Sequence, residues 1–105
     1  MKSSILIKKK DKFFVEDVCI DSIIEKFATP TYIYSKQRIV DNFKNLESAF
    51  KTVDHLICFA VKANSNLAIL NLLAKNGAGF DIVSGGELRR VIACLLYTSP
   101  SPRDL

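Results

Sequence analysis

The stretch that decides the fold is residues 55–66, which read HLICFAVKANSN. A short apolar run, residues 56–61, has the length and composition of a buried β-strand. Lys62 follows it directly and precedes an Asn-Ser-Asn turn. A charged amine seldom follows so many apolar positions. Because functional groups gather at the carboxyl ends of strands in α/β folds, we take Lys62 as a candidate functional residue.

Two further segments extend the pattern. Asn66 can cap a helix over 67–75, which Asn76-Gly77 ends, and residues 80–83 predict a second short strand. Ser84-Gly85-Gly86-Glu87 fits a capping box before a helix over 88–93. A strand and a helix that alternate in steps of about 20 residues indicate βα units and a parallel sheet.

The amino-terminal part has a different pattern. Residues 5–7 and 13–15 predict a β-hairpin around a lysine-rich turn. Residues 22–27 predict a short helix with Asp21 or Ser22 as its cap.

Thr29-Pro30-Thr31 is expected to break this helix, and Tyr32-Ile33-Tyr34 predicts a strand of β-forming residues. Ser35 is expected to open a helix that runs to about Phe50. Its apolar side chains repeat at helical spacing: Ile39, Val40, Phe43, Leu46 and Phe50.

Composition excludes several classes of protein. The chain has 105 residues and a net charge of +4, part of which comes from lysines near its start. Such a cluster could touch nucleic acid or an anionic membrane, but no aromatic residues interleave with it, so we interpret it as a solvated turn. No apolar run approaches the roughly 18 residues of a membrane span, and residues 1–7 do not resemble a signal peptide.

The cysteines and the histidine give no metal-ligand pattern. Three widely spaced cysteines are typical of reduced thiols, which predicts a cytoplasmic protein. We expect Cys58 to be a small buried hydrophobe and His55 to be a surface or packing residue.

The last stretch, Cys94 to Leu105, leaves the helical pattern and ends in Ser-Pro-Ser-Pro. It can be back-translated to a DNA string that resembles the transposon-end adapter of sequencing libraries. We therefore expect residues 94–105 to be an artefactual tail that packs poorly, with a natural proline-rich linker as the alternative. The predicted organisation is a hairpin and short helix over 1–28, a partial barrel domain over 29–93, and this tail.

Lys62 and Asp81 are the residues most suited to chemistry. Phe59 and Val61 are expected to exclude water from the lysine amine, and a neutral amine can attack an aldehyde. Asp81 comes 19 residues later in the next strand and would share the same edge of the sheet. The alternatives are a lysine that snorkels at the sheet rim and an aspartate that caps a turn. The amides after Ser84 could also bind an anion, although the signal is weak.

Three segments together resemble the diaminopimelate decarboxylases, a branch of the alanine-racemase-like group of pyridoxal-phosphate enzymes: TPTYIYS (29–35), FAVKANSN (59–66) and GAGFDIVSGGEL (77–88). The resemblance covers roughly residues 13–93. Ornithine decarboxylases have Cys where this chain has Ala63, and alanine racemases continue after the lysine motif with Tyr-Gly-His-Gly. Both depart from this chain at positions where it keeps the diaminopimelate pattern.

The resemblance implies the start of a (β/α)₈ barrel that binds pyridoxal phosphate, cut off after about two βα units. It implies that Lys62 forms a Schiff base with the cofactor, that Asp81 lies beside it in the active site, and that Ala60 belongs to the cofactor site. It further implies conversion of meso-diaminopimelate to L-lysine and carbon dioxide by a homodimer with shared active sites, with no metal. The fragment alone is expected to be inactive.

Three alternatives stay open. One is a related decarboxylase of the ornithine or carboxynorspermidine type. Another is a barrel protein that carries pyridoxal phosphate without catalysis. The last is a small α/β interaction module, whose best support is the chain length, and an artefactual tail removes that support.

Overall fold

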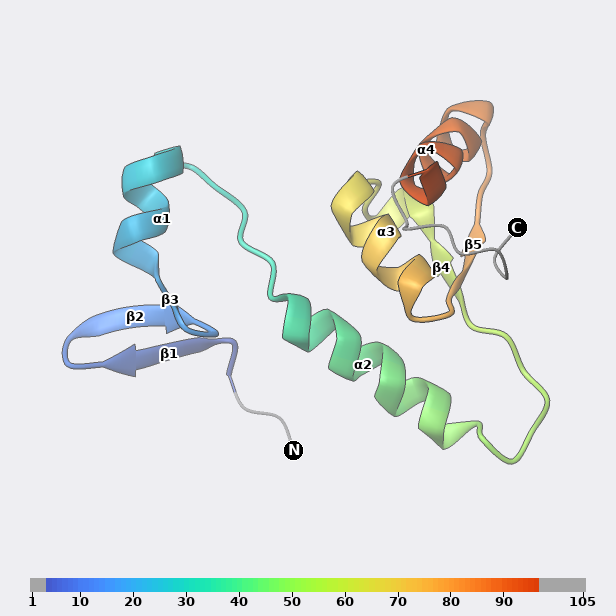
Figure 1. Ribbon diagram of the computed structural model, residues 1–105, viewed down its shortest axis with the longest axis horizontal. Helices are drawn as coiled ribbons and strands as arrows, with labels where there is room; N and C mark the ends of the chain where they lie inside the picture. Colours follow the sequence, from blue (N-terminus) through green and yellow to red (C-terminus); the bar gives the residue numbers. More distant parts are fainter. Residues whose placement is uncertain (1–3, 97–105) are drawn as a thin grey trace. The chain divides into compact units, whose positions relative to one another are not determined.

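The computed structural model describes residues 4–96. The chain divides into two compact units, residues 1–39 and 40–105, which are described separately below (Figure 1). The domain boundary after residue 28, which the sequence suggested, stays a prediction.

The first unit contains the predicted hairpin. Strands β1 (Leu6–Lys9) and β2 (Lys12–Val15) are antiparallel, and the short strand β3 (Val18–Cys19) pairs with the other edge of β2. Lys10 and Asp11 between β1 and β2 both have positive φ angles, as a two-residue hairpin turn requires. The hairpin prediction is confirmed, whereas β3 was not expected.

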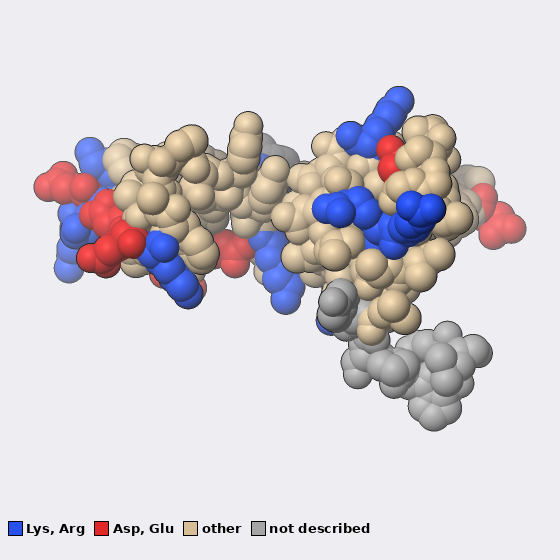
Figure 2. All heavy atoms as spheres, turned by 90° about the horizontal axis from the view of Figure 1, so that it is seen from above, with Lys and Arg blue, Asp and Glu red and all other residues tan. Residues whose placement is uncertain are grey.

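Helix α1 (Ile20–Phe27) begins earlier than predicted. Its N-cap is Cys19, which makes no side-chain capping bond, so the prediction of Asp21 or Ser22 as the cap is wrong. The reason is that β3 leads directly into the helix. Ser22 lies within the first turn and donates to the Cys19 carbonyl, and the Asp21 carboxylate pairs with Lys12 at 3.0 Å. Acidic and basic side chains mix on the visible face of this unit (Figure 2), as on a solvated surface.

The predicted strand at Tyr32-Ile33-Tyr34 is wrong. The sheets among residues 4–96 are β1-β2-β3 and a separate pair of strands, and neither includes these residues. Tyr32 is 90% exposed. β-forming side chains make a strand only where a partner edge supplies hydrogen bonds, and no described ladder supplies them here.

Helix α2 (Lys36–Ala49) is close to its predicted range, and Ser35 caps it by accepting a bond from the Arg38 amide at 3.1 Å. The buried Ser35 hydroxyl donates to the Glu16 carboxylate at 2.8 Å, and the Gln37 amide donates to the same oxygen at 3.0 Å. Both bonds lower the pKa of Glu16, and the bond from the Gln37 amide has the larger effect. Glu16 therefore ties the hairpin to the start of α2.

The second unit has the predicted βα units in parallel order. Its elements are β4 (Cys58–Ala60), the 3₁₀ turn η1 (Val61–Ala63), α3 (Leu67–Lys75), β5 (Gly79–Asp81) and α4 (Gly85–Leu96). Strands β4 and β5 are parallel, with Cys58 opposite Gly79 and Ala60 opposite Asp81. The prediction of a parallel sheet is confirmed, although both strands are shorter than expected.

Cys58 is exposed, so the prediction of a buried thiol is wrong. It lies on the side of β4 away from Phe59, which packs against the core. A Cβ atom at Gly79 would come within 2.9 Å of the Cys58 sulfur. The glycine therefore permits the close approach of β5 to β4 at this pair.

The core of the second unit lies between its helices and the strand ends. Val61, Leu70 and Cys94 are fully buried, and Val91 is 7% exposed. Asn71 on α3 donates to the Cys94 carbonyl on α4 at 2.9 Å.

The expectation that packing fails after Ala93 is wrong for Cys94. Helix α4 continues to Leu96, and Cys94 falls three residues after Val91 on its buried face. Burial raises the pKa of the Cys94 thiol. Residues 97–105 of the suspected tail lie outside the described residues, and an adapter origin of the tail stays a prediction.

Asn66 caps α3 as predicted, since its side-chain oxygen accepts a bond from the Ala68 amide at 2.9 Å. Replacing Asn66 by alanine leaves this amide without its partner. We expect Asn66→Ala to lower the free energy of unfolding by about 1 kcal/mol. Chemical denaturation of the complete protein measures the change. Asn66→Ser keeps a capping oxygen and should stay near the wild type. An equal loss in both variants would contradict the capping role.

His55 ties the connection before β4 to helix α2. Its Nδ1 lies 2.7 Å from the Val53 carbonyl oxygen, and its Nε2 contacts the Glu47 carboxylate. Phe50 packs against the ring with centroids 5.8 Å apart. Both nitrogens face acceptors, which only the doubly protonated ring can satisfy. The Val53 carbonyl and then the Glu47 carboxylate accordingly raise the pKa of His55.

A raised pKa makes this contact pH-dependent. The stabilisation is complete below the unfolded pKa of about 6.5 and is lost as the pH rises through the folded pKa. The difference in melting temperature between the wild type and His55→Gln should therefore shrink from about pH 5.5 to about pH 8.5. A difference that is constant over this range, or that grows with pH, would contradict the assignment.

Candidate cofactor site

Lys62 lies just beyond the carboxyl end of β4. The strand ends at Ala60, and η1 turns the chain at Val61, whose side chain is fully buried. Lys62 is the next residue and is exposed. The buried Val61 side chain thus anchors the turn in the core, and Lys62 faces solvent.

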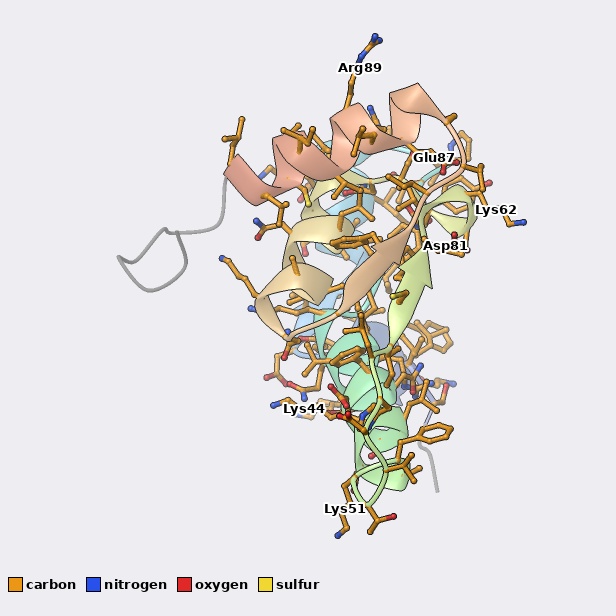
Figure 3. The ribbon with its side chains drawn as sticks, turned by 90° about the vertical axis from the view of Figure 1, so that its right-hand side faces the viewer. Lys44, Lys51, Lys62, Asp81, Glu87 and Arg89 are labelled. Carbon is orange, nitrogen blue, oxygen red and sulfur yellow. The ribbon has the colours of Figure 1, made fainter. Side chains whose placement is uncertain are left out.

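Asp81 is the last residue of β5 and lies opposite Ala60 in the parallel ladder. Lys62 and Asp81 therefore stand at the same edge of the two-stranded sheet, as predicted from the sequence. Figure 3 shows both at this edge, with the lysine side chain directed away from the ribbon. Among residues 4–96, no hydrogen bond or ion pair joins the two. That Asp81 holds the lysine amine stays a prediction, as does the place of Ala60 in a cofactor site.

Phe59 and Val61 do not shield the amine in the way the sequence suggested. Val61 belongs to the core cluster, and Phe59 packs against it. Both side chains thus point into the core, because residues two apart on an extended segment share one face. The exposed amine is accessible, and the expectation that these two residues exclude water from it is wrong for this chain.

The loop after Lys62 is held by several hydrogen bonds. The Asn64 amide donates to the Val61 carbonyl at 3.1 Å, and the Asn66 amide donates to the Asn64 side chain at 3.0 Å. Arg90 on α4 donates from Nε to the Ser65 carbonyl at 3.0 Å. Sequence reasoning missed Arg90. Its position three residues after Glu87, on the helix that follows the Asp81 strand, is the signal that could have indicated it.

The start of α4 is capped largely as predicted. The Glu87 amide donates to the Ser84 hydroxyl at 3.1 Å, and the Glu87 carboxylate accepts from the Val83 amide at 2.8 Å. The carboxylate thus bonds one residue earlier than a standard capping box would place it. The Glu87 carboxylate brings a negative charge to this helix end, and this charge disfavours an external anion. The binding of an anion by the amides after Ser84 stays a prediction.

The described residues 4–96 offer neither a metal centre nor a membrane-spanning helix. No group of three His, Cys, Asp or Glu side chains is arranged to hold a metal ion in this part of the chain. None of the helices described there is long and apolar enough to cross a membrane. An open depression of about 510 Å³ belongs to the first unit, and neither Lys62 nor Asp81 lines it.

The fold and the site define a class. Parallel βα units with functional side chains at the carboxyl edge are typical of α/β barrel enzymes. An accessible lysine amine at that edge can form an imine with a carbonyl group. Residues 36–101 match the family model of the pyridoxal binding domain of pyridoxal-dependent decarboxylases. The chain belongs to this family.

Similar proteins agree with the match. The chain is 55% identical over 82 residues to the diaminopimelate decarboxylase of Pseudomonas fluorescens, which covers 78% of the chain and 20% of that protein. It is 48% identical over 85 residues to the diaminopimelate decarboxylase of Haemophilus influenzae, 81% of the chain and 20% of that protein. The chain therefore spans about a fifth of the length of the curated relatives it matches.

Solved structures confirm the predicted fold class. The diaminopimelate decarboxylase of M. jannaschii has a TM-score of 0.81 and 37% identity, over 87% of this chain and 22% of that one. A structure of the M. jannaschii enzyme in complex with L-lysine has a TM-score of 0.80 and 38% identity, over 86% of this chain and 22% of that one. The second unit is thus part of a pyridoxal-phosphate barrel.

The residues present fit this cofactor. An aldehyde needs an accessible primary amine, and Lys62 supplies one at the sheet edge. Asp81 adds a carboxylate at the same edge. The cofactor predicted from the sequence, pyridoxal phosphate, is that of the family.

Proposed function

We propose that this chain is the amino-terminal part of a diaminopimelate decarboxylase, which converts meso-2,6-diaminopimelate to L-lysine and carbon dioxide. The observation that carries the proposal is 55% identity over 82 residues to an enzyme of that name, in a chain whose Lys62 lies just beyond the first strand of the βα units. The M. jannaschii relative binds L-lysine, the expected product.

Three residues of this chain would form its share of the site. Lys62 would hold pyridoxal phosphate through its side-chain nitrogen. When bound, the cofactor supplies an electron sink for the carbanion left by loss of carbon dioxide. Asp81 would add a carboxylate to the site at the same edge of the sheet. Ala60, opposite Asp81, would leave room at the sheet edge because its side chain is a single methyl group.

The complete protein is proposed to be a cytoplasmic homodimer whose subunits share active sites. Three free cysteines, Cys19, Cys58 and Cys94, support a reducing compartment. The chain covers a fifth of its relatives, so the other groups needed for catalysis would lie in the remaining four-fifths. We therefore expect this piece to be inactive alone.

The test is a substrate comparison. The source DNA is read past Ala93 to obtain the complete reading frame, and the purified protein is supplied with pyridoxal phosphate. We expect it to release carbon dioxide from meso-diaminopimelate and to form L-lysine. Turnover of L-ornithine or carboxynorspermidine in its place would assign a different decarboxylase. Cofactor binding without turnover of any of the three would indicate a carrier.

A further inference from the structure

Arg90 crosses from one βα unit to the other. It lies on α4, the helix that follows the Asp81 strand, and its Nε donates to the Ser65 carbonyl at 3.0 Å. Ser65 lies in the loop that follows Lys62, 25 residues earlier in the sequence. The bond therefore connects the loop after β4 to the helix after β5.

The same helix also holds the loop after β5. The Glu87 carboxylate accepts from the Val83 amide at 2.8 Å, two residues beyond Asp81. Glu87 and Arg90 are three residues apart, so they lie on neighbouring positions of one helix face. Arg89 points away from the helix in Figure 3, while Glu87 lies at the end of α4 that meets the strands. One face of α4 thus fastens the loops that follow both strands.

The other bonds of the Lys62 loop are local. The bond from Asn64 to Val61 and the bond from Asn66 to Asn64 each join residues two or three apart. Such bonds fix the shape of the loop but not its position against β5. Buried Val61 anchors the loop before Lys62. After Lys62, among the hydrogen bonds described, the one from Arg90 ties the loop to the βα unit of Asp81.

A lysine amine needs such an anchor because its long side chain has four rotatable bonds. The amine can be placed accurately only if the backbone at Lys62 is fixed relative to the groups it works with. We propose that Arg90 is a positioning residue for Lys62, which holds the Ser65 carbonyl and so sets Lys62 against Asp81. The inference rests on the proposed function of Lys62 as the cofactor anchor.

The test uses Arg90→Gln in the complete protein, with Arg89→Gln as the matched control. Both arginines are exposed, so neither change disturbs the core. Hydrogen exchange of the amides at 63–68 should rise in Arg90→Gln and stay unchanged in Arg89→Gln. We expect kcat to fall about 10- to 100-fold in Arg90→Gln with a smaller change in KM, since misplacement affects the reacting geometry more than binding. Arg90→Lys should restore most of both, because the bond uses a single donor.

The outcomes separate this inference from the proposed function. Unchanged exchange and unchanged kcat in Arg90→Gln would overturn the inference, and so would an equal rise in exchange throughout α3 and α4, which indicates general loosening. The exchange measurement does not need bound cofactor. If the wild type carries no cofactor on Lys62, the proposed function fails, and the inference fails with it even where exchange at 63–68 rises.

Discussion

Lys62→Ala in the complete protein should lose the absorbance of lysine-bound cofactor and at least about 10³-fold in kcat/KM. The change removes the primary amine at the edge of the sheet, and no described residue offers a second amine beside Asp81. Absorbance spectra and steady-state kinetics with meso-diaminopimelate measure the two effects.

Two control variants make this result specific. Lys62→Arg keeps the positive charge but has no primary amine, so it should be as inactive as Lys62→Ala. Lys75→Ala removes an exposed lysine in the last turn of α3 and should behave as the wild type. Retained cofactor absorbance in Lys62→Ala, or activity in Lys62→Arg near that of the wild type, would show that another residue carries the cofactor.

Leu70→Ala should have the largest effect on stability, because Leu70 on α3 is fully buried in one cluster with Val61 and with Val91 and Cys94 of α4. Removing its side chain loses buried apolar area and leaves a cavity. We expect the free energy of unfolding to fall by about 3 kcal/mol, within the range of about 2 to 5 kcal/mol for such changes. Urea denaturation of the complete protein, followed by the circular dichroism signal, measures this loss.

Leu70→Met is the matched control, since it nearly conserves the volume and should cost less than about 1.5 kcal/mol. Equal midpoints for the two variants would contradict the packing described for this core. They would mean that Leu70 is not enclosed in the complete protein as it is in this unit.

Local signals in the sequence were sufficient for most of the second unit. The Asn66 cap, the apolar run before Lys62 and the Ser84 cap each act over a few residues. All three elements appear, although the strand before Lys62 is shorter than predicted. The errors arise where contacts with a segment distant in the sequence determine the local structure or the burial of a side chain. Tyr32-Ile33-Tyr34 lacks a partner strand. Cys94 is buried because α4 packs on α3, which no local pattern in a Pro-rich tail reveals.

The candidate site shows the same division. Lys62 and Asp81 could be placed from the sequence because parallel strands bring their carboxyl ends to one edge. The bond from Arg90 to Ser65 spans 25 residues, and that from Ser35 to Glu16 spans 19. Arg90 and Glu16 lie outside the quoted motifs, so only the packing of the elements identifies their partners. The exposure of Lys62 likewise depends on Phe59 and Val61 turning into the core.

The most direct measurement is the site of covalent attachment of the cofactor. The complete protein, loaded with pyridoxal phosphate, is reduced with borohydride, digested and analysed by mass spectrometry. We predict that the added mass of the reduced cofactor is found on Lys62, in the peptide that contains the sequence AVKANSN (60–66). Cofactor mass on another lysine, or none on any peptide, would contradict the account.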